Sequence, residues 1–257
     1  MAIDDPRSFF DEHWPGLRTV LEQAGPEAMV ATILERPGDA ERIALLRFMR
    51  QGMIMDDWEG KNLDTYLVVA DTAIEWLSER AAASDSADRE EFLGPLAELT
   101  FNVAADLADC WTGDGELRRA DHFERAAEIA EQSVGLREEL DKPHGSKALG
   151  WWALGYHQLR LDHTDAAVDS MERSLEHARR QAREDGEHDE IGSQAPFAVL
   201  IGAGYLGLAR IADGEPSGPD LYAETLAAFR AQLADPERAG DAEFGIAQLQ
   251  RVEEFLS

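Results

Sequence analysis

The sequence predicts an all-α protein of about ten or eleven helices, and three observations support this fold class. Apolar residues recur at helical spacing in almost every segment. Alternating apolar and polar residues, the pattern of a half-buried strand, are not found. Glycine, proline and helix-capping residues interrupt the periodic segments at short intervals, which indicates short loops between helices.

The first helices begin at clear start signals. Asp5 followed by Pro6 predicts an N-cap and a first helical turn. Gly25 followed by Pro26 ends that helix and starts a short one to about residue 35. A further amphipathic segment at about 39–54 carries an apolar stripe.

A loop at 57–62 precedes a helix at 63–82, whose apolar residues again recur at helical spacing. The polar stretch 83–89 predicts a hinge, and a long helix ending at Trp111 follows it. The later helices are expected at 118–140, 146–161, 165–185, 193–212, 219–234 and 241–256. We therefore expect a less regular helical region at 1–85 and a repeat region at 86–257, with one continuous domain as the alternative.

The chain is strongly acidic. It has 52 Asp and Glu against 24 Lys and Arg, a formal net charge of −28. Such a surface repels nucleic-acid phosphates and anionic lipids, so we expect neither nucleic acid nor a membrane as partner. A basic or apolar protein partner is favoured instead. A salt-rich habitat would favour the acidic surface, and a GC-rich genome would favour arginine over lysine.

The cysteine content, the N-terminal sequence and the longest uncharged stretch indicate a cytoplasmic protein. Cys110 is the only cysteine, so no intrachain disulfide or thiolate cluster can form, and its neighbours indicate an inert, buried thiol. The N-terminus lacks the features of a signal peptide. The longest uncharged stretch, Ile191 to Ala209, is interrupted by Pro196 and four glycines.

Residues 148–181 contain a two-helix motif. Its positions are Trp151, Leu154 and Gly155, followed by Ala167, Met171 and Ser174. This spacing resembles the tetratricopeptide (TPR) repeat, in which Gly155 and Ala167 would face each other across a close helix crossing. A degraded copy at 122–134 aligns with 163–175 at an offset of 41 residues, and 198–211 with 221–233 could form a third pair. Gln158 and Arg179 depart from the usual motif residues.

The resemblance implies a right-handed solenoid of antiparallel helical hairpins, in which the first helix of each pair lines a concave groove. The matching positions here are Leu149, Trp152, Tyr156, Leu159 and Arg160. Aromatic residues and arginine are enriched in binding hot spots. We therefore expect a non-enzymatic module that binds a peptide or helix of a protein partner, without catalytic residues, cofactor or metal. In the alternative, Trp152 and Tyr156 are packed inside the protein.

Residues 202–207 match the Gly-x-Gly-x-x-Gly pattern of dinucleotide-binding loops. That motif needs a preceding strand and a parallel sheet, and only 50 residues, which read as helices, follow it. We interpret the glycines as positions where a helix packs closely against its neighbours.

Two further functions stay open. The carboxylate pairs Asp106/Asp109 and Glu128/Glu131 have a spacing that could hold Mg²⁺ in an all-α hydrolase of phosphorylated small molecules. The second function is self-assembly, through the glycine-rich helix or the apolar stripe of the terminal helix. The residues of that stripe are Phe244, Ile246, Leu249, Val252, Phe255 and Leu256.

Overall fold

The computed structural model describes residues 3–55, 58–85, 88–111 and 117–256, and every regular element in these ranges is helical. The all-α prediction is confirmed. The chain divides into two compact units, Met1–Asp106 and Leu107–Ser257, and each is described by itself. The helix α5 (Arg89–Leu107) therefore lies almost wholly with the first unit, whereas the sequence placed the change of organisation near residue 85.

In its described residues, the first unit contains four further α-helices and a π-helical turn. They are α1 (Pro6–Ala24), α2 (Pro26–Leu34), α3 (Asp39–Arg50), η1 (Gln51–Met55) and α4 (Leu63–Ala83). The predicted helix at 39–54 is thus α3 continued by η1. Gly52 in η1 lies against the indole of Trp14, where a Cβ would come within 2.4 Å of the ring. The wider turn allows this approach of η1 to α1.

A buried carboxylate ties three helices of this unit together. Asp106 of α5 accepts hydrogen bonds from Arg50 Nε at 2.7 Å and from the Tyr66 hydroxyl at 2.9 Å. Burial, followed by the charge of Asp106, raises the pKa of Tyr66. A buried charge is costly without partners. The loss of Arg50 or Tyr66 would therefore destabilise the unit, because the buried Asp106 carboxylate would lose a partner.

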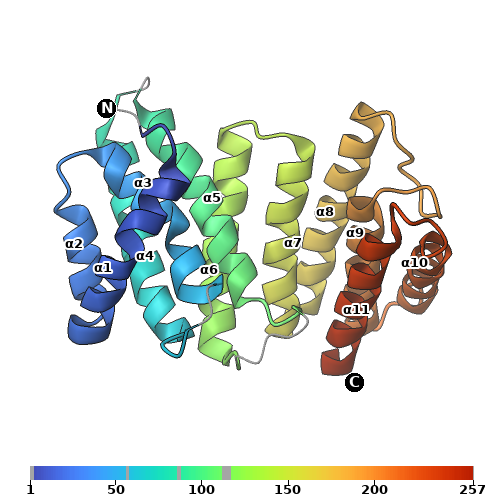
Figure 1. Ribbon diagram of the computed structural model, residues 1–257. Helices are drawn as coiled ribbons and strands as arrows, with labels where there is room; N and C mark the ends of the chain where they lie inside the picture. Colours follow the sequence, from blue (N-terminus) through green and yellow to red (C-terminus); the bar gives the residue numbers. More distant parts are fainter. Residues whose placement is uncertain (1–2, 56–57, 86–87, 112–116, 257) are drawn as a thin grey trace. The chain divides into compact units, whose positions relative to one another are not determined.

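The second unit is a row of helices in which each packs against the next (Figure 1). They are α6 (Ala120–Glu139), α7 (His144–Arg160), α8 (Thr164–Glu184), α9 (Phe197–Ala212), α10 (Gly218–Gln232) and α11 (Ala239–Leu256). The packing runs α6–α7–α8–α9–α10, and α11 packs on both α9 and α10. The expected helix pairs α7–α8 and α9–α10 are confirmed.

Four successive helices of this unit end in the same way. The second residue after each helical end adopts a positive φ, at Asp141, Asp162, Gly186 and Gly214. The next amide then donates back across the last turn, as Lys142 N does to Arg137 O at 2.9 Å. This is the Schellman arrangement, which satisfies carbonyls that a helix end leaves open. The repeated cap explains why the predicted boundaries of α6 to α9 lie within a few residues of the observed ones.

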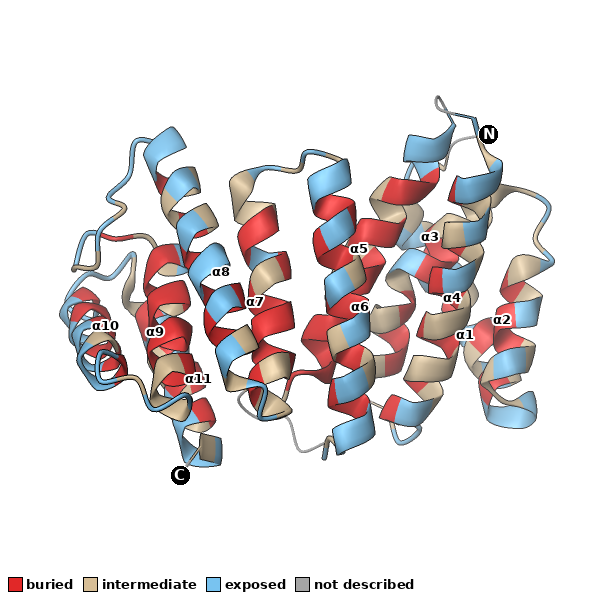
Figure 2. Ribbon diagram, turned by 180° about the vertical axis from the view of Figure 1, so that it is seen from behind, coloured by how far each residue is buried: buried red, intermediate tan, exposed pale blue. Residues whose placement is uncertain are grey.

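The glycine-rich segment is helical, as expected, and forms part of α9. Figure 2 shows α9 with buried residues around most of its surface, unlike α8. Gly202 faces Leu175 of α8, Gly204 faces Leu249 of α11, and Gly207 faces the Tyr222 backbone of α10. The three glycines thus allow three neighbours to approach one central helix.

The close crossing of α7 and α8 is also present, one turn from where the motif places it. A Cβ on Gly155 would lie 3.1 Å from Ser170 Cβ and 3.1 Å from the Met171 methyl group. Ser170 in turn donates to Gln158 Oε1 at 2.7 Å. The residue that replaces the usual motif side chain therefore serves as a hydrogen-bond acceptor between the two helices. Across the described parts of the chain, no helix combines the length and apolarity needed to cross a bilayer.

Candidate functional site

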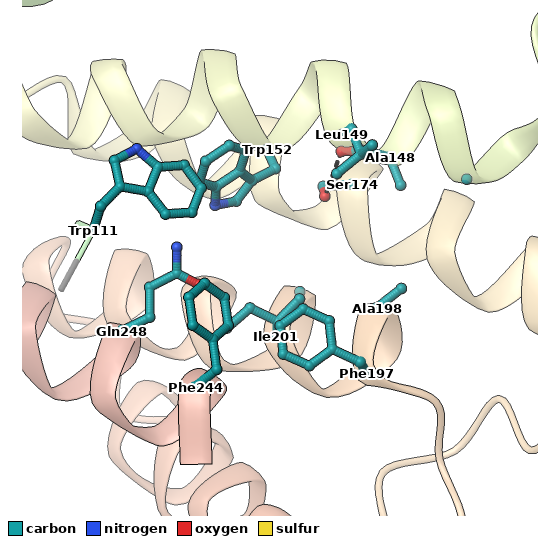
Figure 3. Close-up of a pocket in the computed structure, with 12 residues that line it drawn as sticks. Trp111, Ala148, Leu149, Trp152, Ser174, Phe197, Ala198, Ile201, Phe244 and Gln248 are labelled. Carbon is teal, nitrogen blue, oxygen red and sulfur yellow. Dashed lines mark hydrogen bonds between the residues drawn. The ribbon is translucent and has the colours of Figure 1, made fainter. Parts of the chain in front are cut away.

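A pocket of about 350 Å³ lies between α7, α9 and α11 of the second unit (Figure 3). The residues that line it are Trp111, Gly145, Ala148, Leu149, Trp152, Ser174, Phe197, Ala198, Ile201, Gly202, Phe244 and Gln248. None of these side chains is ionisable. The pocket is thus suited to hold an apolar group rather than to transfer a proton.

Four aromatic rings form a continuous wall around the pocket. Trp111 packs edge-on against Trp152 at 5.8 Å between ring centroids and stacks on Phe244 at 6.4 Å. Phe197 contacts Phe244 at 6.1 Å. Figure 3 shows the two tryptophans on one side of the pocket and the two phenylalanines on the other. Because each ring packs against another, the aromatic contacts stabilise this wall of the pocket.

Two large apolar side chains of this lining are exposed, Leu149 at 48% and Phe244 at 42%. Two polar side chains of the lining already donate hydrogen bonds within the unit, whereas the buried Trp152 Nε1 has no hydrogen-bond partner among the described residues. Ser174 Oγ donates to the Ala148 carbonyl at 2.9 Å, and Gln248 Nε2 donates to Cys110 Sγ at 3.2 Å. The pocket and its rim therefore form one apolar surface that is open to solvent.

The structure separates the five residues that the sequence proposed for the groove. Leu149 and Trp152 line the pocket. Tyr156 and Leu159 are buried in the core, 0% and 4% exposed. The Tyr156 hydroxyl donates to Asp109 Oδ1 at 2.5 Å, and burial raises the pKa of Tyr156 well above its usual value. These two side chains thus belong to the core and not to the pocket lining.

The side chain of Arg160 in α7 contacts residues of α6 and α11. Its guanidinium pairs with Asp109 Oδ2 at 3.1 Å. It also lies over the rings of Phe123 in α6 and Phe255 in α11, 5.0 and 4.6 Å from their centroids. The charge of Arg160 is thus used within the unit, and the aromatic contacts shield the ion pair on both sides.

The repeat motif suggests that Trp151 is packed in the core and that Trp152 faces the groove, but Trp152 is the more buried of the two. Trp151 is half-buried and lies under the guanidinium of Arg173, 4.6 Å away. Trp152 is 8% exposed and contacts Trp111 and Tyr205. From the sequence we expect Trp151→Ala to destabilise the protein by about 3–5 kcal/mol, and Trp152→Ala to weaken partner binding without unfolding it. The packing predicts the larger loss of stability for Trp152.

Asp109 and Cys110, which follow α5, are held by the helix farthest from them in the sequence. Arg251 Nε of α11 donates to the Asp109 carbonyl at 2.6 Å. Cys110 is buried as expected, and burial raises its pKa to about 11. These contacts place Trp111 over the pocket.

Trp111, Phe197 and Phe244 were not assigned to the groove from the sequence. Trp111 follows the end of α5, Phe197 begins α9 and Phe244 lies in α11, so no single helical stripe contains two of them. Phe244 was part of the apolar stripe of the terminal helix, which is the one signal that pointed to it. Leu249 and Val252 of that stripe are buried inside the unit, whereas Phe244 and Phe255 remain exposed.

Three of the four carboxylates of the hydrolase alternative are paired with other side chains. Asp106 pairs with Arg50, and Asp109 accepts from Tyr156 and Arg160. Glu128 pairs with Arg125 on the exposed face of α6. Within the described residues, no group of three or more His, Cys, Asp or Glu side chains is placed to hold a metal ion.

One histidine contact was not anticipated. His144 and His177, 33 residues apart, approach with their Nδ1 atoms 2.8 Å from each other, so one ring donates and the other accepts. Glu184 lies 3.6 Å from His144 Nε2, and Glu138 lies 3.7 Å from His177 Nε2. The pair fastens the start of α7 to α8. Desolvation is the main reason that the pKa of His177 is lowered.

Comparison of the chain with models of known protein families, with curated proteins and with solved structures gave no match.

Proposed function

We propose that the protein is a non-enzymatic interaction module of the cytoplasm, a TPR-like helical repeat that binds an apolar peptide or helix of a protein partner. The observation that carries this proposal is the aromatic pocket between α7, α9 and α11, with its exposed rim. Recognition by apolar anchors that enter a helical groove is a recurrent mode of peptide binding.

The rim favours a protein segment over a small molecule. A small ligand inside the pocket would leave Leu149 and Phe244 in water. A helix or extended peptide would cover both while one or two of its side chains fill the cavity. Burial of this apolar surface supplies the affinity, at roughly 25 cal/mol per Å² before the cost of association is subtracted.

The test uses a pair of matched substitutions. Leu149→Arg places a charge at the rim, whereas Leu233→Arg places the same charge at the C-cap of α10, at a side chain that is 41% exposed and outside the pocket. Since both positions are exposed, both variants should keep the urea midpoint of the wild type. The three proteins serve as baits for affinity purification from the host, and the recovered proteins are identified.

We expect a partner whose recovery falls by about tenfold or more with Leu149→Arg and is unchanged with Leu233→Arg. Equal recovery from all three baits would overturn the proposal. A small apolar compound that copurifies without any protein would overturn it as well. If the recovered partner is the protein itself, with a mass in solution that rises with concentration, self-assembly replaces binding to another protein.

A further inference from the structure

A second hollow of about 210 Å³ adjoins the aromatic pocket. Phe197 lines both cavities. The other residues around the second hollow are Glu187, Ala195, Pro196, Gln232, Arg238 and Asp241. The two cavities therefore lie on either side of one aromatic residue.

The hollow carries uncompensated negative charge. Glu187 and Asp241 are both exposed, and within the described residues neither carboxylate has a hydrogen-bond or ion-pair partner. Arg238, the one cationic residue of the lining, is committed elsewhere. It donates to the Ser193 and Ala195 carbonyls at 3.3 and 3.2 Å and lies 3.7 Å from Asp235.

Carboxylates in another hollow of the same unit are neutralised. A cavity between α8 and α9 is lined by Glu172 and Glu176, and these pair with Arg210 and Arg180. Of these two hollows, the one with open carboxylates is the one that adjoins the apolar pocket. An apolar cavity next to unpaired carboxylates is complementary to a segment that carries an apolar and a cationic side chain close together.

Resting on the proposed function, we infer that the bound segment places a Lys or Arg within about one helical turn of its apolar anchor, and that Glu187 and Asp241 select it. The anchor fills the aromatic pocket, and the cation crosses Phe197 into the acidic hollow. Residues three or four apart on a helix lie about 5–6 Å from each other, which matches a passage over one ring. The net charge of −28 adds a long-range attraction for such a segment.

The probe for this inference is a random peptide library displayed on phage and selected against the full-length protein. The strongest selected sequence is then synthesised, together with a version in which its basic residue is replaced by Gln. Dissociation constants are measured by fluorescence polarisation at low and at physiological salt. The protein variants are Glu187→Gln, Asp241→Asn and, as the control, Glu131→Gln, which removes one exposed carboxylate of α6 outside the pocket.

We expect enrichment of peptides with a large apolar residue and a Lys or Arg within four positions of it. Each of the two hollow variants should weaken binding about two- to fivefold at low salt, and the loss should shrink as salt rises. Glu131→Gln should have no effect. The Gln version of the peptide should bind the wild type and the hollow variants alike.

The outcomes separate the two proposals. If peptides bind and Leu149→Arg abolishes binding, but the hollow variants and the Gln peptide change nothing, the selection of a cation is refuted and the apolar pocket stands. If the selected peptides bind Leu149→Arg as well as they bind the wild type, the proposed function itself is refuted.

Discussion

Gly207 in α9 provides the sharpest test of the packing. A Cβ at this position would lie 2.9 Å from Tyr222 N and 3.0 Å from Tyr222 Cα, so Gly207→Ala must push α9 and α10 apart. Overpacking of this kind costs about 1–3 kcal/mol. The higher helix propensity of Ala returns about 1 kcal/mol. The expected net loss is therefore up to about 2 kcal/mol in the free energy of unfolding.

Two other glycines supply matched controls. Gly135 lies exposed in α6 with open space around it, so Gly135→Ala should stabilise by about 1 kcal/mol. A Cβ at Gly202 would meet Leu175 Cα at 3.5 Å, an ordinary contact, so Gly202→Ala should be neutral or mildly stabilising. Urea unfolding followed by circular dichroism gives the free energy and the m-value for each variant.

The difference between Gly207→Ala and Gly135→Ala isolates the steric cost, because both changes carry the same propensity gain. We expect this difference to be about 1–3 kcal/mol. A Gly207→Ala variant that gains as much stability as Gly135→Ala would refute the close approach of α9 and α10.

Three further predictions concern single side chains. Tyr156→Phe removes the hydrogen bond to Asp109 and should cost about 1.5–3 kcal/mol in urea unfolding, whereas Tyr222→Phe, whose acceptor is exposed, should cost less than about 1 kcal/mol. Asp162 has φ 62°, so Asp162→Gly should raise the thermal midpoint by relieving about 0.5–1 kcal/mol of backbone strain; a lower midpoint would contradict this. The Cys110 thiol has its pKa raised from 9.0 to about 11, so between these pH values the unfolded thiol ionises before the folded one. Stability should then fall with rising pH by about 2–3 kcal/mol from this group, and Cys110→Ala should remove that part of the slope.

Local signals predicted the helices well because helix ends depend on neighbouring residues. Asp5 caps α1 by accepting from Ser8 N at 3.1 Å, and Asn62 caps α4 in the same manner. Both lie where the sequence indicates a start. The end of the long helix near Trp111 was misplaced, since α5 stops at Leu107. The residues that follow bond to helices far along the chain instead.

The candidate site was only partly predictable for the same reason. Helical spacing placed Leu149 and Trp152 on one surface of α7, and both line the pocket. It could not show that Tyr156, one turn further on, lies beneath Asp109. Nor could spacing bring Trp111 and Phe244 together, because their contact depends on how α11 packs. The His144–His177 contact joins two helices and carries no local pattern.

The bond between Arg251 and the Asp109 carbonyl joins residues 142 positions apart. During synthesis, α6 to α10 can pack as they leave the ribosome, since each contacts its neighbour in sequence. The wall of the pocket cannot close at that stage, because Phe244 and Gln248 belong to α11. Long-range contacts of this kind form late, as they require the closure of a long loop. A nascent chain would thus acquire its helical stack before its binding surface, and partner binding would report that α11 has docked.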